Sequence, residues 1–229
     1  MIASEKEIVR RKPRGYVFKV RTRSQLEAAL TLADYVIVSP DNYVSNDKIW
    51  LAPPRFSPSG FTLPGGVHDI YCQNVGHLMY GNSLSGVTLH GGFGLNVINN
   101  EASSLLAGFG VNDITVGIEA NVKDILRIKS DILTIYAYGR FPLMLIKQRL
   151  KGSLTDRTGR HFPIKGDEIL NSVKLSLSGR LEKVNADRLL LDFNDESPQE
   201  MENIYRSFRK NVNISADNRE NITRGLYGI

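Results

Sequence analysis

Three polar side chains in this sequence are suited to catalysis, and each lies near the end of a short apolar run. They are Glu119, His90 and Tyr138. A carboxylate or an imidazole can act as general acid or base, and a tyrosine ring can stack on a base or another ring. Glu119 could equally be a metal ligand, or a charge that interacts with the dipole of a helix beginning after Asn121. These three residues form the candidate catalytic set.

A second group of polar residues is suited to binding a substrate or an anion. Its members are Arg140, Arg157, Arg160, Asn96 and Asn99. A guanidinium presents a planar pair of donors that matches a carboxylate or a phosphate. The competing interpretation of the arginines is a salt bridge to Asp156 that holds a local β-structure. Residues 91–94 (GGFG) allow close approach of a ligand or simply form a turn, and they lack the spacing of a dinucleotide-binding or phosphate-binding loop.

Residues able to bind a metal ion are few and poorly spaced. The sequence has one cysteine, Cys72, and four histidines. His68 and Cys72 stand at opposite ends of one expected strand, about 13 Å apart at 3.3 Å per residue, whereas the ligands of one ion lie about 2.0–2.3 Å from it. We predict no metal site and interpret Cys72 as a buried apolar side chain. A single cysteine also excludes an intrachain disulfide and a multi-thiolate cluster.

Short β-branched and aromatic runs recur along the chain and supply the strands that would position these residues. We expect eight, at residues 16–20, 35–39, 49–52, 69–73, 86–90, 113–118, 133–138 and 189–193. Many are almost wholly apolar, as is typical of strands covered on both faces. Capping residues at Ser24, Asn121 and Ser197 indicate helix starts between some of them. This alternation predicts a (β/α)8 barrel of TIM type, with its site at the C-terminal ends of the strands.

Two stretches interrupt the alternation. Residues 53–66 are rich in Pro, Gly and Ser and too broken for a full crossover helix. Residues 141–184 separate the seventh and eighth strands, and within them 153–160 and 161–165 indicate a hairpin that turns at Thr158-Gly159. We therefore expect a basic N-terminal arm at residues 1–15 and one barrel domain at 16–229, with a small β-insertion at about 141–184.

The 229 residues carry a formal charge of +5 that is unevenly distributed. Residues 1–23 hold eight basic and two acidic side chains, and residues 140–165 hold seven basic side chains opposed only by Asp156. Two basic patches favour contact with phosphate, although a solvated tail and a solvated loop have the same composition. The 41% hydrophobic content excludes a disordered or disulfide-stapled chain. No apolar run reaches the roughly 20 residues of a membrane span and the N-terminus lacks a secretory segment, so we expect a cytoplasmic protein without membrane contact.

Several motifs, taken in order, resemble a known family. Residues 138–144 (YGRFPLM) and 154–164 (LTDRTGRHFPI) are similar to the YGR-x-PLM and LTDR-x-G-x-x-FP stretch of the collagenase-like peptidases of unassigned catalytic type, peptidase family U thirty-two. Residues 21–29 (RTRSQLEAA), 94–99 (GLNVIN) and 223–225 (TRG) resemble a helix start, a strand end and a terminal motif of the same family. The resemblance covers most of the chain from about residue 20 onward and corresponds to the later part of the longer members.

The resemblance implies a TIM-barrel-like fold and a bacterial or archaeal cytoplasmic setting. It implies one of two functions: a hydrolase, as a peptidase with collagenase-like activity, or part of an RNA-modification enzyme that hydroxylates RNA bases or of an enzyme that hydroxylates quinone precursors. Several members bind iron–sulfur clusters through cysteines that usually follow the PLM motif. Residues 145–150 (LIKQRL) contain no cysteine, so we expect no iron–sulfur cluster from this chain alone and name no other cofactor.

The same resemblance implies the partners. These are an RNA or a peptide substrate, and an N-terminal catalytic half or partner subunit, because the matched motifs belong to the later portion of longer proteins. We expect a family member with weak or no independent catalysis. The alternative is a non-catalytic module that binds RNA or docks on a partner.

Overall fold

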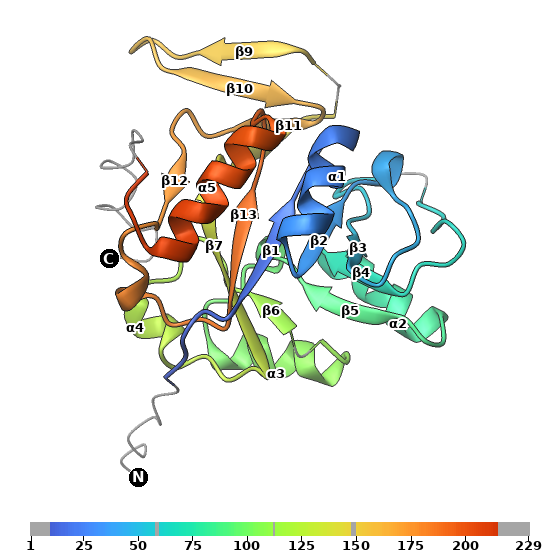
Figure 1. Ribbon diagram of the computed structural model, residues 1–229. Helices are drawn as coiled ribbons and strands as arrows, with labels where there is room; N and C mark the ends of the chain where they lie inside the picture. Colours follow the sequence, from blue (N-terminus) through green and yellow to red (C-terminus); the bar gives the residue numbers. More distant parts are fainter. Residues whose placement is uncertain (1–9, 58–59, 112, 148–149, 215–229) are drawn as a thin grey trace.

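Eight parallel strands close into a barrel in the computed structural model, which describes residues 10–57, 60–111, 113–147 and 150–214 (Figure 1). The strands are β1 (Gly15–Lys19), β2 (Tyr35–Val38), β3 (Ile49–Leu51), β4 (Asp69–Cys72), β5 (Thr88–Gly91), β6 (Asp113–Thr115), β7 (Ile132–Gly139) and β13 (Arg188–Asp192). Strand β13 pairs with both β1 and β7, and β7 pairs with β6, which closes the ring. The barrel predicted from the sequence is confirmed.

Helices cover the barrel unevenly. They are α1 (Arg23–Leu32), α2 (Met79–Ser83), α3 (Asn100–Gly108), α4 (Val122–Ile125) and α5 (Pro198–Lys210), with 3-10 turns at Pro40–Asn42, Val75–Leu78, Phe93–Leu95 and Leu181–Lys183. Helices α1 and α5 lie side by side on one flank (Figure 1). In the described residues, the connection from β3 to β4 carries no helix, as its broken sequence predicts.

The helix starts follow the capping chemistry of the sequence, with one correction. Asn121 caps α4, and Ser197 caps α5 in a box with Glu200, as expected. Helix α1, however, is capped by Thr22 and not by Ser24. The Thr22 hydroxyl accepts from the Gln25 N–H at 3.2 Å, and the Gln25 side chain accepts from the Thr22 N–H at 3.2 Å. The box therefore begins two residues earlier than expected.

The insertion between β7 and β13 forms a second, antiparallel sheet. Its strands are β8 (Pro142–Leu145), β9 (Gly152–Thr155), β10 (His161–Lys165) and β11 (Glu168–Leu170), in the order β8-β11-β10-β9. Strand β12 (Leu175–Ser176) pairs antiparallel with β7 outside the ring. The β9–β10 hairpin projects beyond the end of the barrel (Figure 1). The predicted β-excursion is confirmed, and β8 and β11 extend it into a four-stranded sheet.

Successive side chains of β1 point alternately into the barrel and toward the layer beneath α5. Phe18 packs edge-on against Phe193 and Tyr205, with ring centroids 4.9 and 5.6 Å apart, so this face of β1 lies under the helix. Helix α5 buries Met201, Ile204 and Phe208 on the same layer. The neighbouring residues of β1 therefore face the barrel interior, and Lys19 is one of them.

The described part of the N-terminal arm is attached to the barrel. The Arg11 side chain is largely buried, where its guanidinium contacts Asp187 and donates to the Ser130 carbonyl. The Arg11 backbone N–H donates to Asn185 Oδ1 at 2.7 Å. Asp187 immediately precedes β13, so these contacts hold the arm at the end of the barrel where the strands begin.

Candidate functional site

A pocket of about 370 Å³ lies where the C-terminal ends of β1 to β4 meet the small sheet. Its polar wall is formed mainly by Lys19, Arg21, Arg55, Gln73 and Glu168. Pro53, Pro54 and Phe61 contribute an apolar wall. A parallel barrel places its ligands at this end of the strands, because the loops that follow the strands converge there.

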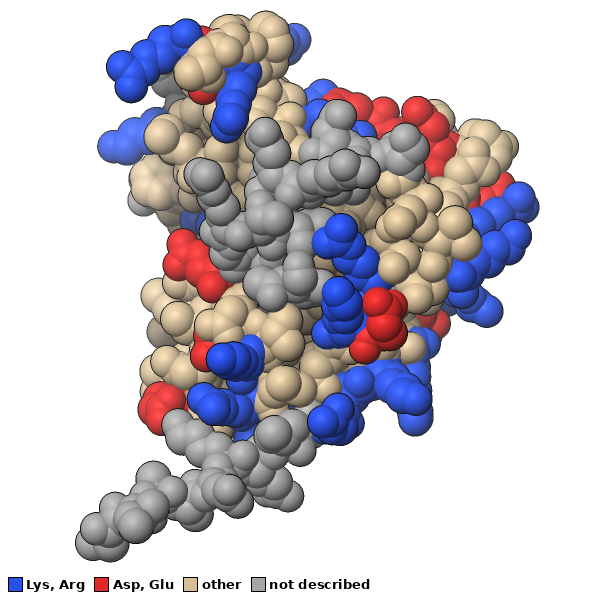
Figure 2. Space-filling model, turned by 90° about the vertical axis from the view of Figure 1, so that its left-hand side faces the viewer, with Lys and Arg blue, Asp and Glu red and all other residues tan. Residues whose placement is uncertain are grey.

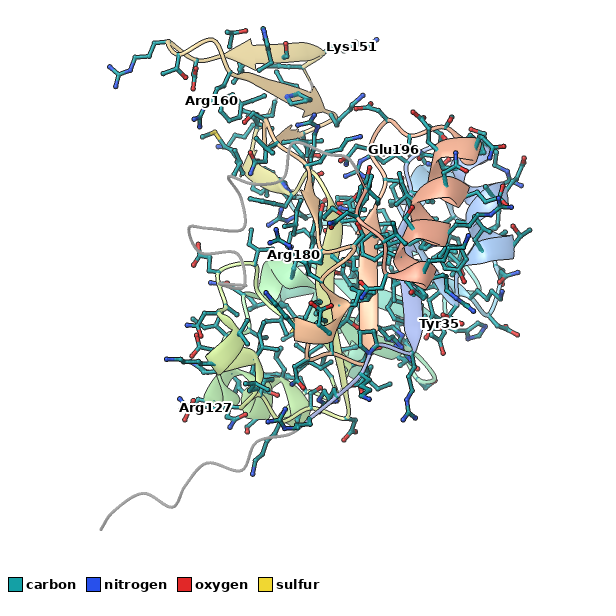
Figure 3. All side chains as sticks on the ribbon, turned by 60° about the vertical axis from the view of Figure 1, so that its left-hand side comes forward. Tyr35, Arg127, Lys151, Arg160, Arg180 and Glu196 are labelled. Carbon is teal, nitrogen blue, oxygen red and sulfur yellow. The ribbon has the colours of Figure 1, made fainter. Side chains whose placement is uncertain are left out.

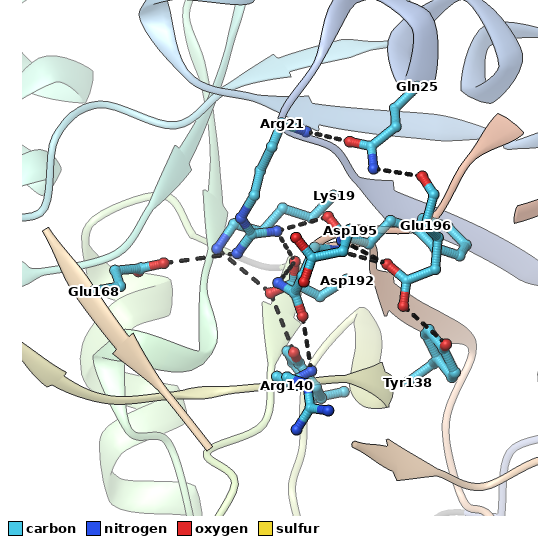
Figure 4. A network of polar contacts seen from close by, with 12 residues as sticks. Lys19, Arg21, Gln25, Tyr138, Arg140, Glu168, Asp192, Asp195 and Glu196 are labelled. Atoms are coloured by element: carbon cyan, nitrogen blue, oxygen red, sulfur yellow. Dashed lines mark hydrogen bonds and ion pairs between the residues drawn. The ribbon is translucent and has the colours of Figure 1, made fainter. Parts of the chain in front are cut away.

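Asp192, the last residue of β13, is the buried anion beside this pocket. Its side chain is fully enclosed: Arg21 Nη1 contacts Oδ1, and Lys19 Nζ lies 3.5 Å from Oδ2 (Figure 4). The Tyr136 hydroxyl donates to Oδ2 at 3.1 Å. Burial acts to raise the pKa of Asp192, but the positive charges of Arg21 and Lys19 outweigh it and hold the pKa below the ordinary aspartate value. Asp192 is therefore an ionised carboxylate with both oxygens engaged.

Glu168 brings the insertion into the pocket. It is the first residue of β11, and its side chain is about one-eighth exposed at 12%. Its carboxylate lies 3.6 Å from Arg21 Nη2 and 3.8 Å from Arg55 Nη1. Both separations are longer than a hydrogen bond, so Glu168 is held by charge with its oxygens open to further hydrogen bonds.

Two buried polar atoms of the pocket residues have no hydrogen-bond partner. They are Arg21 Nη2, a donor, and Gln73 Oε1, an acceptor. Gln73 is only 6% exposed, so its orphaned oxygen is a costly feature unless a ligand or water satisfies it. The donor and the acceptor belong to residues that line one pocket. A donor and an acceptor without hydrogen-bond partners on residues of the same pocket are the strongest indication of a ligand among the described residues.

The loop after β5 approaches the end of β4 so closely that only glycine fits. A Cβ added at Gly94 would lie 2.3 Å from the Gln73 carbonyl oxygen, and one at Gly92 would lie 2.7 Å from the Cys72 carbonyl oxygen. Phe93, between them, presents its ring to Lys19 and Arg55 at 5.7 and 5.9 Å. The glycines in residues 91–94 thus permit backbone packing that brings an aromatic face beneath two pocket cations.

The structure places the three candidate catalytic residues in three different environments. Glu119 is exposed in the turn before α4. Tyr138 faces the layer beneath α5, where its ring packs near Phe208 and its hydroxyl donates to Glu196 at 2.9 Å. His90 lies inside the barrel. No interaction between described residues joins any two of the three, and their catalytic roles stay predictions.

His90 belongs to a buried cluster nearer the N-terminal end of the barrel. Its Nε2 lies 2.8 Å from an oxygen of Asp69, and its Nδ1 lies 3.0 Å from an oxygen of Asp113. Its ring stacks on Trp50 with centroids 3.7 Å apart, and Arg188 also pairs with Asp113. Burial acts to lower the pKa of His90, but the hydrogen bonds and charges of the two aspartates outweigh it and raise the pKa. Asp69, Asp113 and Arg188 each begin a strand, so this cluster is remote from the strand ends that form the pocket.

The arginines predicted to bind an anion are separated as well. The Arg140 guanidinium donates to the Asn171 and Ser172 carbonyls and so ties the end of β7 to the insertion. Arg157 and Arg160 lie in the turn between β9 and β10. Figure 3 labels Arg160 on this projecting hairpin. The backbone N–H of Arg160 donates to Asp156 Oδ1 at 3.0 Å, which stabilises the hairpin turn.

Asn96 and Asn99 have local roles in the loop after β5. Asn96 ends the Phe93–Leu95 turn with φ of 51°, a left-handed conformation that asparagine tolerates. Asn99 caps α3, its side chain accepting from the Ala102 N–H at 2.9 Å. Both side chains are exposed.

The structure also places the residues that were considered as metal ligands or as a reactive thiol. Within the described residues, no group of three or more His, Cys, Asp and Glu side chains could hold a metal ion. Burial raises the pKa of the Cys72 thiol to about 12, so the thiol stays protonated at neutral pH. His77 Nδ1 accepts from the Gln73 N–H at 3.2 Å, which shapes the loop at the pocket edge.

The main pocket residues are not among those predicted from the sequence. Lys19 and Asp192 lie at the ends of the first and eighth expected strands, and Arg21 follows the first. The rule that selected Tyr138 and Arg140, a polar residue at a strand's C-terminal end, applies equally to them. Glu168 carries no such signal, because its position depends on how the insertion folds over the barrel.

The fold and the pocket together define a class: a parallel eight-stranded barrel with a pocket at the C-terminal ends of its strands. Comparisons of the chain with protein-family models, curated proteins and solved structures find no match. None of the helices in the described ranges combines the length and apolar character needed to span a membrane.

Proposed function

We propose that the pocket at the barrel mouth binds a peptide segment, and that this chain is a barrel of the collagenase-like peptidase type with weak or no hydrolysis of its own. The observation that carries the proposal is that two buried polar atoms of the pocket residues, Arg21 Nη2 and Gln73 Oε1, have no hydrogen-bond partner. A peptide group offers a carbonyl oxygen to the first and an N–H to the second. The ordered motifs shared with the family support the same class of ligand.

The rest of the pocket suits a peptide better than a polyanion. Its cations Lys19, Arg21 and Arg55 are balanced by carboxylates, including Asp192 and Glu168. A row of phosphates needs an excess of positive charge, which this pocket lacks. Pro53, Pro54 and Phe61 supply apolar surface for the side chains of a peptide.

The chemistry open to these groups is limited. Asp192 has no exposed surface and uses both oxygens internally, so it is unsuited to activating water. Glu168 is partly exposed and makes no short hydrogen bond that would occupy its oxygens among the described residues. In hydrolysis, the Glu168 carboxylate would take a proton from a water molecule while the oxygen of that water attacks the peptide carbonyl carbon. Glu168 would then give the proton to the amine that leaves when the C–N bond breaks. Arg21 Nη2 would stabilise the oxyanion.

A binding titration with a set of Gly-Pro-X hexapeptides tests the proposal. Gln73→Leu removes the orphaned acceptor at similar volume and leaves a bound N–H unpaired. We expect its dissociation constant to rise roughly 5- to 100-fold, the equivalent of about 1–3 kcal/mol. Gln199→Leu, at an exposed position of α5, is the matched control and should bind like the wild type. No peptide binding, or equal binding by Gln73→Leu, would show that the proposal is wrong.

A separate assay addresses hydrolysis. Peptide turnover by the wild type and by Glu168→Gln is followed by mass spectrometry over long incubation. Any turnover is expected to be slow and to disappear in Glu168→Gln while peptide binding is retained. Rapid turnover that survives this substitution would place the chemistry on other residues.

A further inference from the structure

Two carboxylates that line the barrel pocket have no ion-pair partner among the described residues. The cations of the lining each lie close to a carboxylate, in pairs that comprise Lys19 and Arg21 with Asp192, and Arg21 and Arg55 with Glu168. Asp41 and Asp167 line the same pocket, and neither forms an ion pair with a described residue. The charge left over in the pocket lining is therefore negative.

Both carboxylates extend from backbone that hydrogen bonds hold at the pocket. Asp41 lies in the 3-10 turn after β2, and the side chain of its neighbour Asn42 donates to the Arg21 carbonyl at 3.0 Å. Asp167 lies in the turn between β10 and β11, and its carbonyl accepts from the Ile146 N–H at 2.8 Å. One unpaired carboxylate thus belongs to a barrel loop and the other to the insertion.

The basic residues of the insertion do not neutralise these two carboxylates. Lys165, two positions before Asp167, contacts Asp195 instead. Lys147, just after β8, neither lines the pocket nor forms an ion pair with Asp167. Figure 2 shows further Lys and Arg side chains on the projecting hairpin at the top of the view, beyond the end of the barrel. A cation supplied by a ligand would therefore gain a counter-ion in the pocket without displacing one of the protein's own.

An independent observation points to a ligand in this pocket. Gln73 is only 6% exposed, and its Oε1, in the same lining, has no hydrogen-bond partner. The apolar wall of Pro53, Pro54 and Phe61 can cover the methylene stem of a long basic side chain while the charged end reaches a carboxylate. The lining thus combines an amide acceptor, an apolar wall and unpaired negative charge.

We propose that the pocket selects peptides that carry a lysine or arginine side chain, and that Asp41 and Asp167 are the residues that select it. The inference rests on the peptide binding proposed above and names the class of peptide that is bound. An acidic side chain would have to draw a lining cation away from its present carboxylate, and a neutral side chain would gain nothing from the two unpaired carboxylates. The expected order of affinity is therefore basic, then neutral, then acidic.

The test compares hexapeptides of sequence Gly-Pro-X-Gly-Pro-X, acetylated and amidated at their ends, in which X is arginine, citrulline or glutamate. Citrulline has the shape of arginine without its charge. In calorimetric titrations of the wild type, the arginine peptide should bind about 4- to 25-fold more tightly than the citrulline peptide, because each solvent-accessible ion pair contributes about 2- to 5-fold. Asp41→Asn combined with Asp167→Asn should bring this ratio to about one. Asp47→Asn, at an exposed position before β3 that does not line the pocket, is the matched control and should keep the wild-type ratio.

A charge reversal provides a second variant. Asp41→Lys combined with Asp167→Lys should bind the glutamate peptide more tightly than the arginine peptide, a result that a purely structural effect of the substitutions would not produce. Higher salt should lower the wild-type ratio of arginine to citrulline binding, because it screens the charges.

The outcomes separate this inference from the proposed function. Equal binding of the arginine and citrulline peptides by the wild type, or an unchanged ratio in the protein with both Asp→Asn substitutions, overturns the inference and leaves peptide binding intact. A preference seen only in peptides with a free N-terminus also overturns it, because the α-amine would then supply the charge. Failure of all the peptides to bind overturns the proposed function and this inference together.

Discussion

Arg21 and Glu168 face each other at the mouth of the barrel, with 3.6 Å between Arg21 Nη2 and Glu168 Oε2 (Figure 4). Arg21 follows β1, whereas Glu168 begins β11 of the inserted sheet. The same carboxylate lies 3.8 Å from Arg55, after β3. Two barrel loops and the insertion therefore meet at one side chain, and the insertion forms part of the pocket wall.

Substituting Glu168 should loosen the insertion more than the barrel. Its two ion pairs are longer than hydrogen bonds, so we expect Glu168→Gln to cost about 1 kcal/mol or less in the free energy of unfolding. Faster amide exchange in residues 142–147 and 150–170, with unchanged exchange in β1 and β13, is the expected signature. Glu202→Gln, which removes an exposed pair with Arg206 on α5, is the control and should leave the insertion unaffected.

Removing the charge of Asp192 should be far more damaging. Asp192→Asn leaves Lys19 and Arg21 largely buried without their shared counter-ion, and breaking a buried pair costs about 3–5 kcal/mol. Urea unfolding measures this loss. Asp195→Asn is the matched control, because Asp195 is about half exposed and pairs with Lys165. A loss for Asp192→Asn no larger than that for Asp195→Asn would contradict the buried network.

The same network predicts the response to acid. The pKa of Asp192 lies below its ordinary value of 3.8 in the folded protein, so its stabilising contribution is complete above 3.8. That contribution is lost as the pH falls through the lower folded-state pKa. Unfolding measured between about pH 2 and 6 should therefore show a steeper acid loss in the wild type than in Asp192→Asn.

His90 predicts a pH dependence of opposite sign. Asp113 and Asp69 outweigh the effect of burial and raise its pKa above the ordinary 6.5. Its stabilising contribution is complete below 6.5 and is lost as the pH rises through the higher folded-state pKa. The wild type should lose stability over this range, whereas His90→Asn should show a flatter profile. His161→Asn, at an exposed position, should follow the wild type.

The glycine after Phe93 gives a steric prediction. A methyl group at Gly94 would meet the Gln73 carbonyl oxygen at 2.3 Å, so Gly94→Ala must displace backbone at the pocket edge. We expect a loss of about 1–3 kcal/mol in thermal or urea unfolding. Gly108→Ala is the control at the end of α3, where the added carbon has no neighbour within 4 Å, and should be neutral or stabilising by up to about 1 kcal/mol. Equal effects of the two substitutions would contradict the close approach of these loops.

Local patterns determined much of the fold. The apolar runs at residues 35–39 and 189–193 predicted buried parallel strands, and both form them. Ser197 and Glu200 predicted the start of α5, because a capping box depends only on the four residues from 197 to 200. The sequence predicted Ser24 as the N-cap of α1, whereas the structure shows Thr22 in that role. Both residues carry a hydroxyl group and lie two positions apart, so only the residue at which the helix actually begins distinguishes them.

Tertiary structure alone decided the site. The sequence places Tyr138, His90 and Glu119 near strand ends, but side-chain direction sends Tyr138 under α5 and His90 into the barrel. Conversely, Arg21 and Glu168 are 147 positions apart in the chain, and no local pattern relates them. Sequence periodicity sets which residues form strands and which faces are apolar, because those are short-range effects. Which charges share a pocket depends on how the ring closes and where the insertion folds, and these are long-range consequences of packing.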